Sequence, residues 1–269
     1  MRTISLTPEI TVLQSATEIP MLGVLPVNSF LIKGDEPILI DTGMTPDKEE
    51  FLATLGSLID PADLRWIWLT HADRDHTGAI SELLELAPNA RVATAFITLG
   101  LMLAGNQPIP PERAYLVRTG TVVEAGSRSL EAIRPPLFDN PGTVGFYDRT
   151  SGVLFSSDFL GGVMPSMDHA YADDITEVPD SDVATGQLLW GSVDAPWVHN
   201  ADEAKFGRDI DMVRACDPKI VLSTHLPPIR GNVDAHLKTV SKLPSSAPTM
   251  LPDQAVLEAA MSEIAHGEG

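Results

Sequence analysis

Leu69-Thr70-His71-Ala72-Asp73-Arg74-Asp75-His76-Thr77-Gly78 holds two imidazoles and two carboxylates within six residues. An apolar run at 64–69 precedes these groups and a helical pattern at 78–86 follows them, so they lie at a strand-to-helix turn. A sharp turn directs successive side chains around its tip, which places four potential metal ligands in one space. The alternative is a charged surface loop that caps the helix, but a cap needs only one Asp. The stretch therefore predicts a metal-binding turn.

The turn resembles the metal-binding loop of the metallo-β-lactamase superfamily, which usually reads His-x-His-x-Asp-His. Over roughly residues 10–230 the chain agrees with that superfamily in the order and spacing of its other motifs. Asp41 opens Asp-Thr-Gly after an apolar strand, Asp158 follows Gly-Val-Leu-Phe-Ser-Ser, and His225 follows Val-Leu-Ser-Thr. The resemblance implies an α/β fold, the four-layer αβ/βα metallo-β-lactamase sandwich, with metals at one edge of its sheets.

Two metal positions are implied by the resemblance. The residues that match the family's ligand positions are His71, Asp73 and Asp139 for the first metal, Asp75, His76 and His225 for the second, and Asp158 as the bridge. Asn140 is an alternative to its neighbour Asp139, and Asp41 is expected to hold the metal loop by hydrogen bonds. His169 and His199 are further candidates, with ordinary loop histidines as the alternative interpretation.

Two departures from the common zinc hydrolases affect the expected chemistry. Asp73 stands where the loop usually has its second His, and Asp139 stands where the third His usually falls. Carboxylate-rich sites suit iron and manganese better than zinc, so we expect two metal ions with iron favoured and zinc or manganese as alternatives. A carboxylate in this loop position also resembles the flavodiiron proteins, whose loop reads His-x-Glu-x-Asp-His and which reduce oxygen or nitric oxide at two irons.

The first functional hypothesis is therefore a di-iron protein that binds or reduces oxygen or nitric oxide. About 26 residues follow Leu243, too few for a flavin domain, so a separate electron-donor protein is expected as partner. The alternative is a metal-dependent hydrolase, in which a metal-bridging hydroxide attacks a small-molecule ester, lactone, thioester or phosphodiester. Four carboxylates would weaken the Lewis acidity that hydrolysis needs and would stabilise oxidised iron.

Composition limits the other partners and the location. The chain has 18 Lys and Arg against 37 Asp and Glu, a net charge of −19, and no basic cluster for nucleic acid or an anionic membrane. We see no signal peptide and no apolar run of membrane-spanning length, and the single Cys excludes an intrachain disulfide. These features predict a cytoplasmic protein.

Residues 1–243 are predicted to form the metallo-β-lactamase-fold domain, followed by a linker and a C-terminal helix in 244–269. Within the domain, 161–200 is expected to be a long, irregular insertion rich in Asp, Met and aromatic residues. The functional interpretation of the insertion is a cap over the metal site. The alternatives are a surface subdomain or an oligomer contact, which makes a homodimer a candidate assembly.

Overall fold

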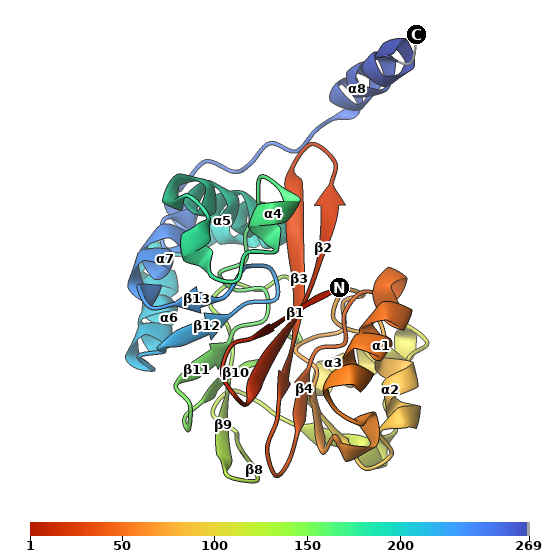
Figure 1. The fold of residues 1–269 in the computed structure, drawn as a ribbon. Coiled ribbons are helices and arrows are strands. Elements are labelled where there is room, and N and C mark those ends of the chain that lie inside the picture. Colours follow the sequence, from red (N-terminus) through yellow and green to blue (C-terminus); the bar gives the residue numbers. More distant parts are fainter. Residues whose placement is uncertain (268–269) are drawn as a thin grey trace.

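The structure is a computed structural model that describes residues 1–267 as two β-sheets packed between helices (Figure 1). The first sheet has seven strands in chain order: β1 (Arg2–Ser5), β2 (Ile10–Ile19), β3 (Gly23–Ile32), β4 (Ile38–Ile40), β5 (Trp66–Trp68), β6 (Arg91–Thr94) and β7 (Ala114–Leu116). The second has six strands in the order β13-β12-β11-β10-β9-β8: β8 (Val122–Ala125), β9 (Arg128–Ile133), β10 (Gly145–Asp148), β11 (Val153–Phe155), β12 (Ile220–Leu222) and β13 (Ile229–Arg230).

Helices cover the outer face of each sheet (Figure 1). Beside the first sheet lie α1 (Lys48–Leu58), α2 (Ile80–Leu86) and α3 (Phe96–Ala104). Beside the second lie α4 (Met167–Ala170), α5 (Asp180–Asp194), α6 (Glu203–Ala215) and α7 (Val233–Val240), while α8 (Gln254–Gly267) projects away from the sandwich. Short 3-10 helices occupy several connections: Thr45–Asp47, Pro61–Asp63, Pro111–Arg113, Ile175–Glu177, Pro196–Asn200 and Leu243–Ser245.

Three apolar layers hold these elements together, because successive strand residues point to opposite faces of a sheet. Ile40 of β4 and Phe155 of β11 belong to the core between the two sheets. Their neighbours point outward: Leu39 packs in the layer that contains α1, and Leu154 in the layer that contains α6 and α7. Complete burial of such side chains stabilises the fold by about 1.5–3 kcal/mol each. The predicted αβ/βα sandwich is confirmed.

The insertion at 161–200 is mainly helical, and the expectation of an irregular segment was wrong. Its main element is the 15-residue helix α5, whose Gly186 and Gly191 weaken the helical signal in the sequence. Tertiary packing requires both glycines. A Cβ on Gly186 would lie 2.1 Å from the carbonyl oxygen of Val163, and one on Gly191 would lie 2.7 Å from the Leu243 side chain.

No helix within the described residues has the length and apolar character needed to cross a bilayer.

The segment that follows the sandwich contacts the end of α5. Leu243 is fully buried beside Gly191, and the backbone N–H of Thr249 donates to Ser192 Oγ at 2.8 Å. The division of the chain at residue 243 stays a prediction.

Candidate metal centre

The candidate ligands meet where four strands end. β4 and β5 are parallel neighbours in the first sheet, and β11 and β12 are parallel neighbours in the second. Asp41 follows β4, the 71–76 loop follows β5, Asp158 follows β11 and His225 comes shortly after β12. Carboxyl ends of parallel strands open at the same edge of a sheet. The sandwich therefore brings these segments to one edge, although His225 lies far from the loop in sequence.

Close backbone packing fixes the metal loop against the segment that carries Asp41. The N–H of Thr42 donates to the His76 carbonyl at 2.8 Å, and the N–H of Gly78 donates to the Gly43 carbonyl at 2.7 Å. A Cβ on Gly78 would lie 2.4 Å from that Gly43 oxygen, so a residue with a side chain would push the two segments apart. The Thr-Gly after His76 is thus part of the architecture of the site.

Three buried imidazoles direct their Nε2 atoms into the same space. Nδ1 of His76 lies 2.8 Å from the Asp41 carboxylate, and Nδ1 of His225 lies 2.8 Å from the carbonyl oxygen of Pro26. Nδ1 of His71 lies 3.2 Å from each of two hydroxyl oxygens. A carboxylate or a carbonyl oxygen can only accept, so the neutral forms of His76 and His225 carry their proton on Nδ1. Their Nε2 lone pairs are then free for a metal.

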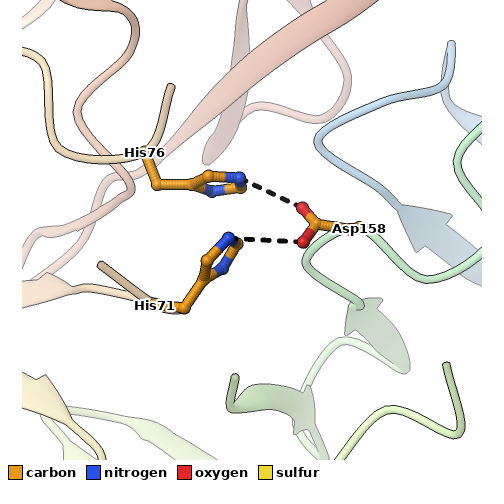
Figure 2. Close-up of side chains that lie close together, drawn as sticks. All are labelled: His71, His76 and Asp158. Atoms are coloured by element: carbon orange, nitrogen blue, oxygen red, sulfur yellow. Dashed lines mark ion pairs between the residues drawn. The ribbon is translucent and has the colours of Figure 1, made fainter. Parts of the chain in front are cut away.

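The carboxylate of Asp158 divides its two oxygens between these imidazoles. Oδ2 lies 3.4 Å from Nε2 of His71, whereas Oδ1 lies 3.1 Å from Nε2 of His76, as Figure 2 shows. Oδ1 also lies 3.2 Å from Nε2 of His225. This is the arrangement expected of a carboxylate that bridges two metal ions.

The other predicted ligands surround Asp158 on two sides. Oδ2 of Asp75 lies 3.3 Å from Nε2 of His225, and Asp73 and Asp139 each place an oxygen 3.8 Å from Nε2 of His71. Ligand atoms within 4.8 Å of one another form four groups: His71, His76 and Asp158; Asp75, His76 and His225; His71, Asp73 and Asp139; Asp139, Asp158 and Asp194. The first three groups contain all seven predicted ligands and the fourth adds a new residue.

Unpartnered buried atoms indicate that the site is built for cations. Nε2 of His76 and Oδ1 of Asp158 have no hydrogen-bond partner, although their side chains are only 1% and 3% exposed. Burying such groups without partners is costly, and a metal ion between them would satisfy both. Imidazole nitrogens and carboxylate oxygens are ligands that iron, manganese and zinc all accept. The residues present fit two divalent ions.

Protons occupy the cluster when no metal is bound. Burial opposes a charge on His225, but hydrogen bonds and charges from Asp158 and Asp75 prevail and raise its pKa to about 10. Burial, reinforced by the nearby charge of Asp158, raises the pKa of Asp139 to about 8. Metal ligands must be deprotonated, so binding of cations would release these protons.

The remaining candidates lie around the site in other roles. The Asn140 amide donates to Oδ1 of Asp73 at 2.9 Å, and its own oxygen accepts from the Gly142 backbone at 2.9 Å, so both ends are already engaged. His199 lies 2.7 Å from Ser192 Oγ. His169 lies on α4, and neither it nor His199 belongs to a ligand group among the described residues.

Sequence reasoning missed one acidic residue at the site. Asp194, at the end of α5, places a carboxylate oxygen within 4.8 Å of oxygens from Asp139 and Asp158. One helical turn earlier, the ring centroid of Trp190 lies 5.4 Å from that of His225. Nothing in the sequence distinguishes Asp194 from the other acidic residues, because it belongs to no motif and its helix was not predicted.

Comparison with known proteins identifies the family. The model of the family described as "ODP family beta lactamase" matches residues 25–188, more than half of the chain. The chain belongs to this family. Among ODP relatives, a putative diflavin flavoprotein of Nostoc sp. is 31% identical over 135 residues, which cover 50% of this chain and 23% of that protein. A nitric oxide reductase of Moorella thermoacetica is 33% identical over 134 residues, which cover 50% of this chain and 33% of that protein.

Solved structures of the same fold cover more of the chain at lower identity. The rubredoxin oxygen:oxidoreductase of Desulfovibrio gigas superposes with a TM-score of 0.79 at 16% identity, over 92% of this chain and 63% of that one. The flavodiiron protein of Giardia intestinalis gives 0.77 at 17% identity, over 91% and 59%. The sandwich of this ODP-family chain is thus the fold of the flavodiiron metal domain. The chain matches only a third or less of the length of the two sequence relatives named above.

Proposed function

We propose that this chain holds two iron ions and uses them to reduce oxygen or nitric oxide with electrons from a separate donor protein. The observation that carries the proposal is the split of the Asp158 carboxylate, with Oδ2 toward His71 and Oδ1 toward His76 and His225. Relatives described as a nitric oxide reductase and a diflavin flavoprotein support the same chemistry.

Each ion would have its own set of ligands. His71, Asp73 and Asp139 would hold the first ion, and Asp75, His76 and His225 the second, with Asp158 between them. Two divalent ions would balance the four carboxylates in charge. Iron in this setting would supply reversible electron transfer and a place for a diatomic gas.

The residues around the ions would orient the ligands and favour redox chemistry over hydrolysis. Asp41 and the Pro26 carbonyl hold the His76 and His225 rings so that Nε2 faces the ions. Anionic ligands stabilise oxidised iron and reduce its acidity as a hydrolytic centre, which favours redox chemistry over hydrolysis. A reducing, cytoplasmic setting would supply ferrous iron and a reduced donor.

We also propose that the insertion at 161–200 covers the site. Support comes from α5, which brings Trp190 beside His225 and Asp194 beside Asp158. Trp197 lies near as well, since its indole N–H donates to the Phe138 carbonyl at 2.8 Å, next to Asp139. Such a cover would limit the access of water and of large substrates.

The proposal is tested by loading the metal-free protein with ferrous iron under anaerobic conditions and adding a chemical reductant. Consumption of oxygen, or of nitric oxide, should be much faster than with zinc-loaded protein and should be lost in Asp158→Asn. An iron-loaded protein that is inert to both gases, while the zinc or manganese form cleaves an ester, lactone, thioester or phosphodiester, would establish the hydrolase instead.

A substitution in the metal loop provides a second arm of this test. Asp73→His restores the loop pattern of the zinc hydrolases, so the ratio of zinc to iron affinity should rise and gas consumption should fall. Asp63→Asn serves as the control and should change neither quantity, because Asp63 is an exposed acid at the end of the 3-10 helix before β5 and belongs to none of the ligand groups among the described residues. An unchanged metal preference in Asp73→His would argue against Asp73 as a ligand.

A further inference from the structure

The end of α5 adds a carboxylate that the family match does not include. The matched residues stop at 188, whereas Asp194 is the last residue of the helix. Its oxygen lies within 4.8 Å of oxygens from Asp139 and Asp158. Asp139 also belongs to the group of His71 and Asp73. Asp194 therefore lies next to the residues predicted to hold the first metal ion.

Without metal ions, protons rather than basic side chains offset the carboxylate charge in this part of the site. Asp139, Asp158 and Asp194 are close together, and among the described residues no Lys or Arg forms an ion pair with any of them. Asp158 is 3% exposed and its Oδ1 has no hydrogen-bond partner. Nearby, the buried indole Nε1 of Trp190 is also without a partner. Three clustered carboxylates with a buried, unpartnered oxygen offer a cation a ready set of ligands once their protons are lost.

The two halves of the site also differ in their imidazoles. The group of Asp75, His76 and His225 has two, whereas the group of His71, Asp73 and Asp139 has one. Asp73 is the most exposed of these acids, with 41% of its side chain accessible, and one of its oxygens is engaged by Asn140. The first metal position therefore has fewer imidazoles, and one of its carboxylates is partly exposed and already hydrogen-bonded.

We propose that Asp194 is a direct ligand of the metal ion held by His71 and Asp139. The proposal rests on the function proposed above, because it requires that the centre binds metal. It makes α5 part of the metal centre as well as its cover. With Asp194 included, the carboxylates outnumber the charges of two divalent ions by one, and the centre favours a trivalent state.

The test measures metal binding by the 269-residue chain, independently of any reaction. Wild type, Asp194→Asn and Asp194→Ala are titrated with Mn²⁺ and with Co²⁺ against a chelator, and the visible spectrum of the Co²⁺ form is recorded. Both variants should bind the second ion normally and lose roughly tenfold or more in affinity for the first. The Co²⁺ spectrum should change, because loss of a ligand alters the coordination number. Asp180→Asn, an exposed acid at the other end of α5, should behave as wild type.

The possible results separate this proposal from the proposed function. If wild type binds two ions and both Asp194 variants do so with unchanged affinity and an unchanged Co²⁺ spectrum, Asp194 is not a ligand, although the metal centre stands. If wild type binds no metal, both proposals fail. A variant that loses only gas consumption, with the same metal affinity, also overturns direct ligation. The metal-free variants should unfold at the wild-type temperature or higher, which excludes misfolding as the cause of weak binding.

Discussion

Nδ1 of His76 lies 2.8 Å from Oδ2 of Asp41, and the two side chains are almost completely buried. The same carboxylate accepts from the backbone N–H of Thr70 at 2.8 Å and from its hydroxyl at 2.9 Å. Asp41 therefore fixes both the ring of His76 and the start of the metal loop. Asp41 contacts the Nδ1 side of the His76 ring, opposite Nε2, and belongs to none of the ligand groups among the described residues.

Asp41→Asn should weaken metal binding by about 10–100-fold. The Asn side chain has only one acceptor oxygen. If its NH2 group faces His76, two donors oppose each other, and if it faces Thr70, a hydrogen bond to Thr70 is lost. Either orientation disturbs the position of the His76 ring, whose Nε2 faces the metal. Chelator competition measures the affinity. Asp63→Asn should retain wild-type affinity, and an equal affinity in Asp41→Asn would contradict the positioning role.

His225→Ala should remove one of the two ions, although His225 is distant in sequence from the loop. A ligand that binds only the folded chain stabilises it, by about 2.7 kcal/mol at a concentration one hundred times Kd, so the stabilisation by metal should shrink. Metal analysis and thermal unfolding with and without metal give both quantities.

His236→Ala is the matched control for that experiment. His236 lies on α7 with Nδ1 3.3 Å from Gln187 Oε1, so its loss costs some packing but no ligand. It should keep two ions. A full metal content in His225→Ala would refute the assignment of His225.

Metal should stabilise the protein more at pH 8 than at pH 5.5. Folding raises the pKa of Asp139 from 3.8 to about 8 and that of His225 from 6.5 to about 10. A group with a raised pKa contributes stability below its unfolded pKa and loses it as the pH rises through the folded value. The metal-free fold is therefore weakened as the pH rises above about 4, while metal binding, which displaces these protons, tightens.

Thermal unfolding of metal-free and metal-loaded protein across this pH range checks the prediction. Asp139→Asn should raise the melting temperature of the metal-free form at pH 8, because it removes a carboxyl group whose charge the site disfavours. A metal-free wild type that is equally stable at pH 5.5 and pH 8 would contradict the expected dependence.

Binding of iron should quench tryptophan fluorescence, with Trp190 responsible for most of the effect. The Trp190 ring is 5.4 Å from that of His225. Trp66 is the first residue of β5, at the end of the strand away from the metal loop, and its indole N–H donates to Glu36. Emission spectra of Trp190→Phe and Trp66→Phe with and without iron test this. Equal quenching in the two variants would count against α5 as a cover.

Much of the fold and the site could be predicted because short motifs sit at strand ends. The loop 71–76, Asp158 and His225 each follow an apolar strand that the sequence makes evident. The edge strands β1 and β7 could not be predicted, since each is short and has little buried surface. Exposed strand residues carry little apolar alternation, which is the signal that sequence reading depends on.

The contribution of α5 could not be read from the sequence for a different reason. Its glycines at 186 and 191 reduce helix propensity, and only contacts with Val163 and Leu243 explain why they are there. Asp194 faces the site because those contacts set the rotation of the helix. Such information lies in packing between segments far apart in the chain.

The hydrogen bonds that join Thr42 and Gly43 to His76 and Gly78 also bear on how metal enters the protein. The segment at Thr42 and Gly43 holds the backbone of the metal loop in place without any ion. Metal binding should therefore order little additional backbone. Loading should then require only loss of protons and small side-chain rotations. Amide hydrogens of Thr42 and Gly78 should exchange slowly with solvent even in the metal-free protein, and metals should be exchangeable under native conditions without a cycle of unfolding and refolding.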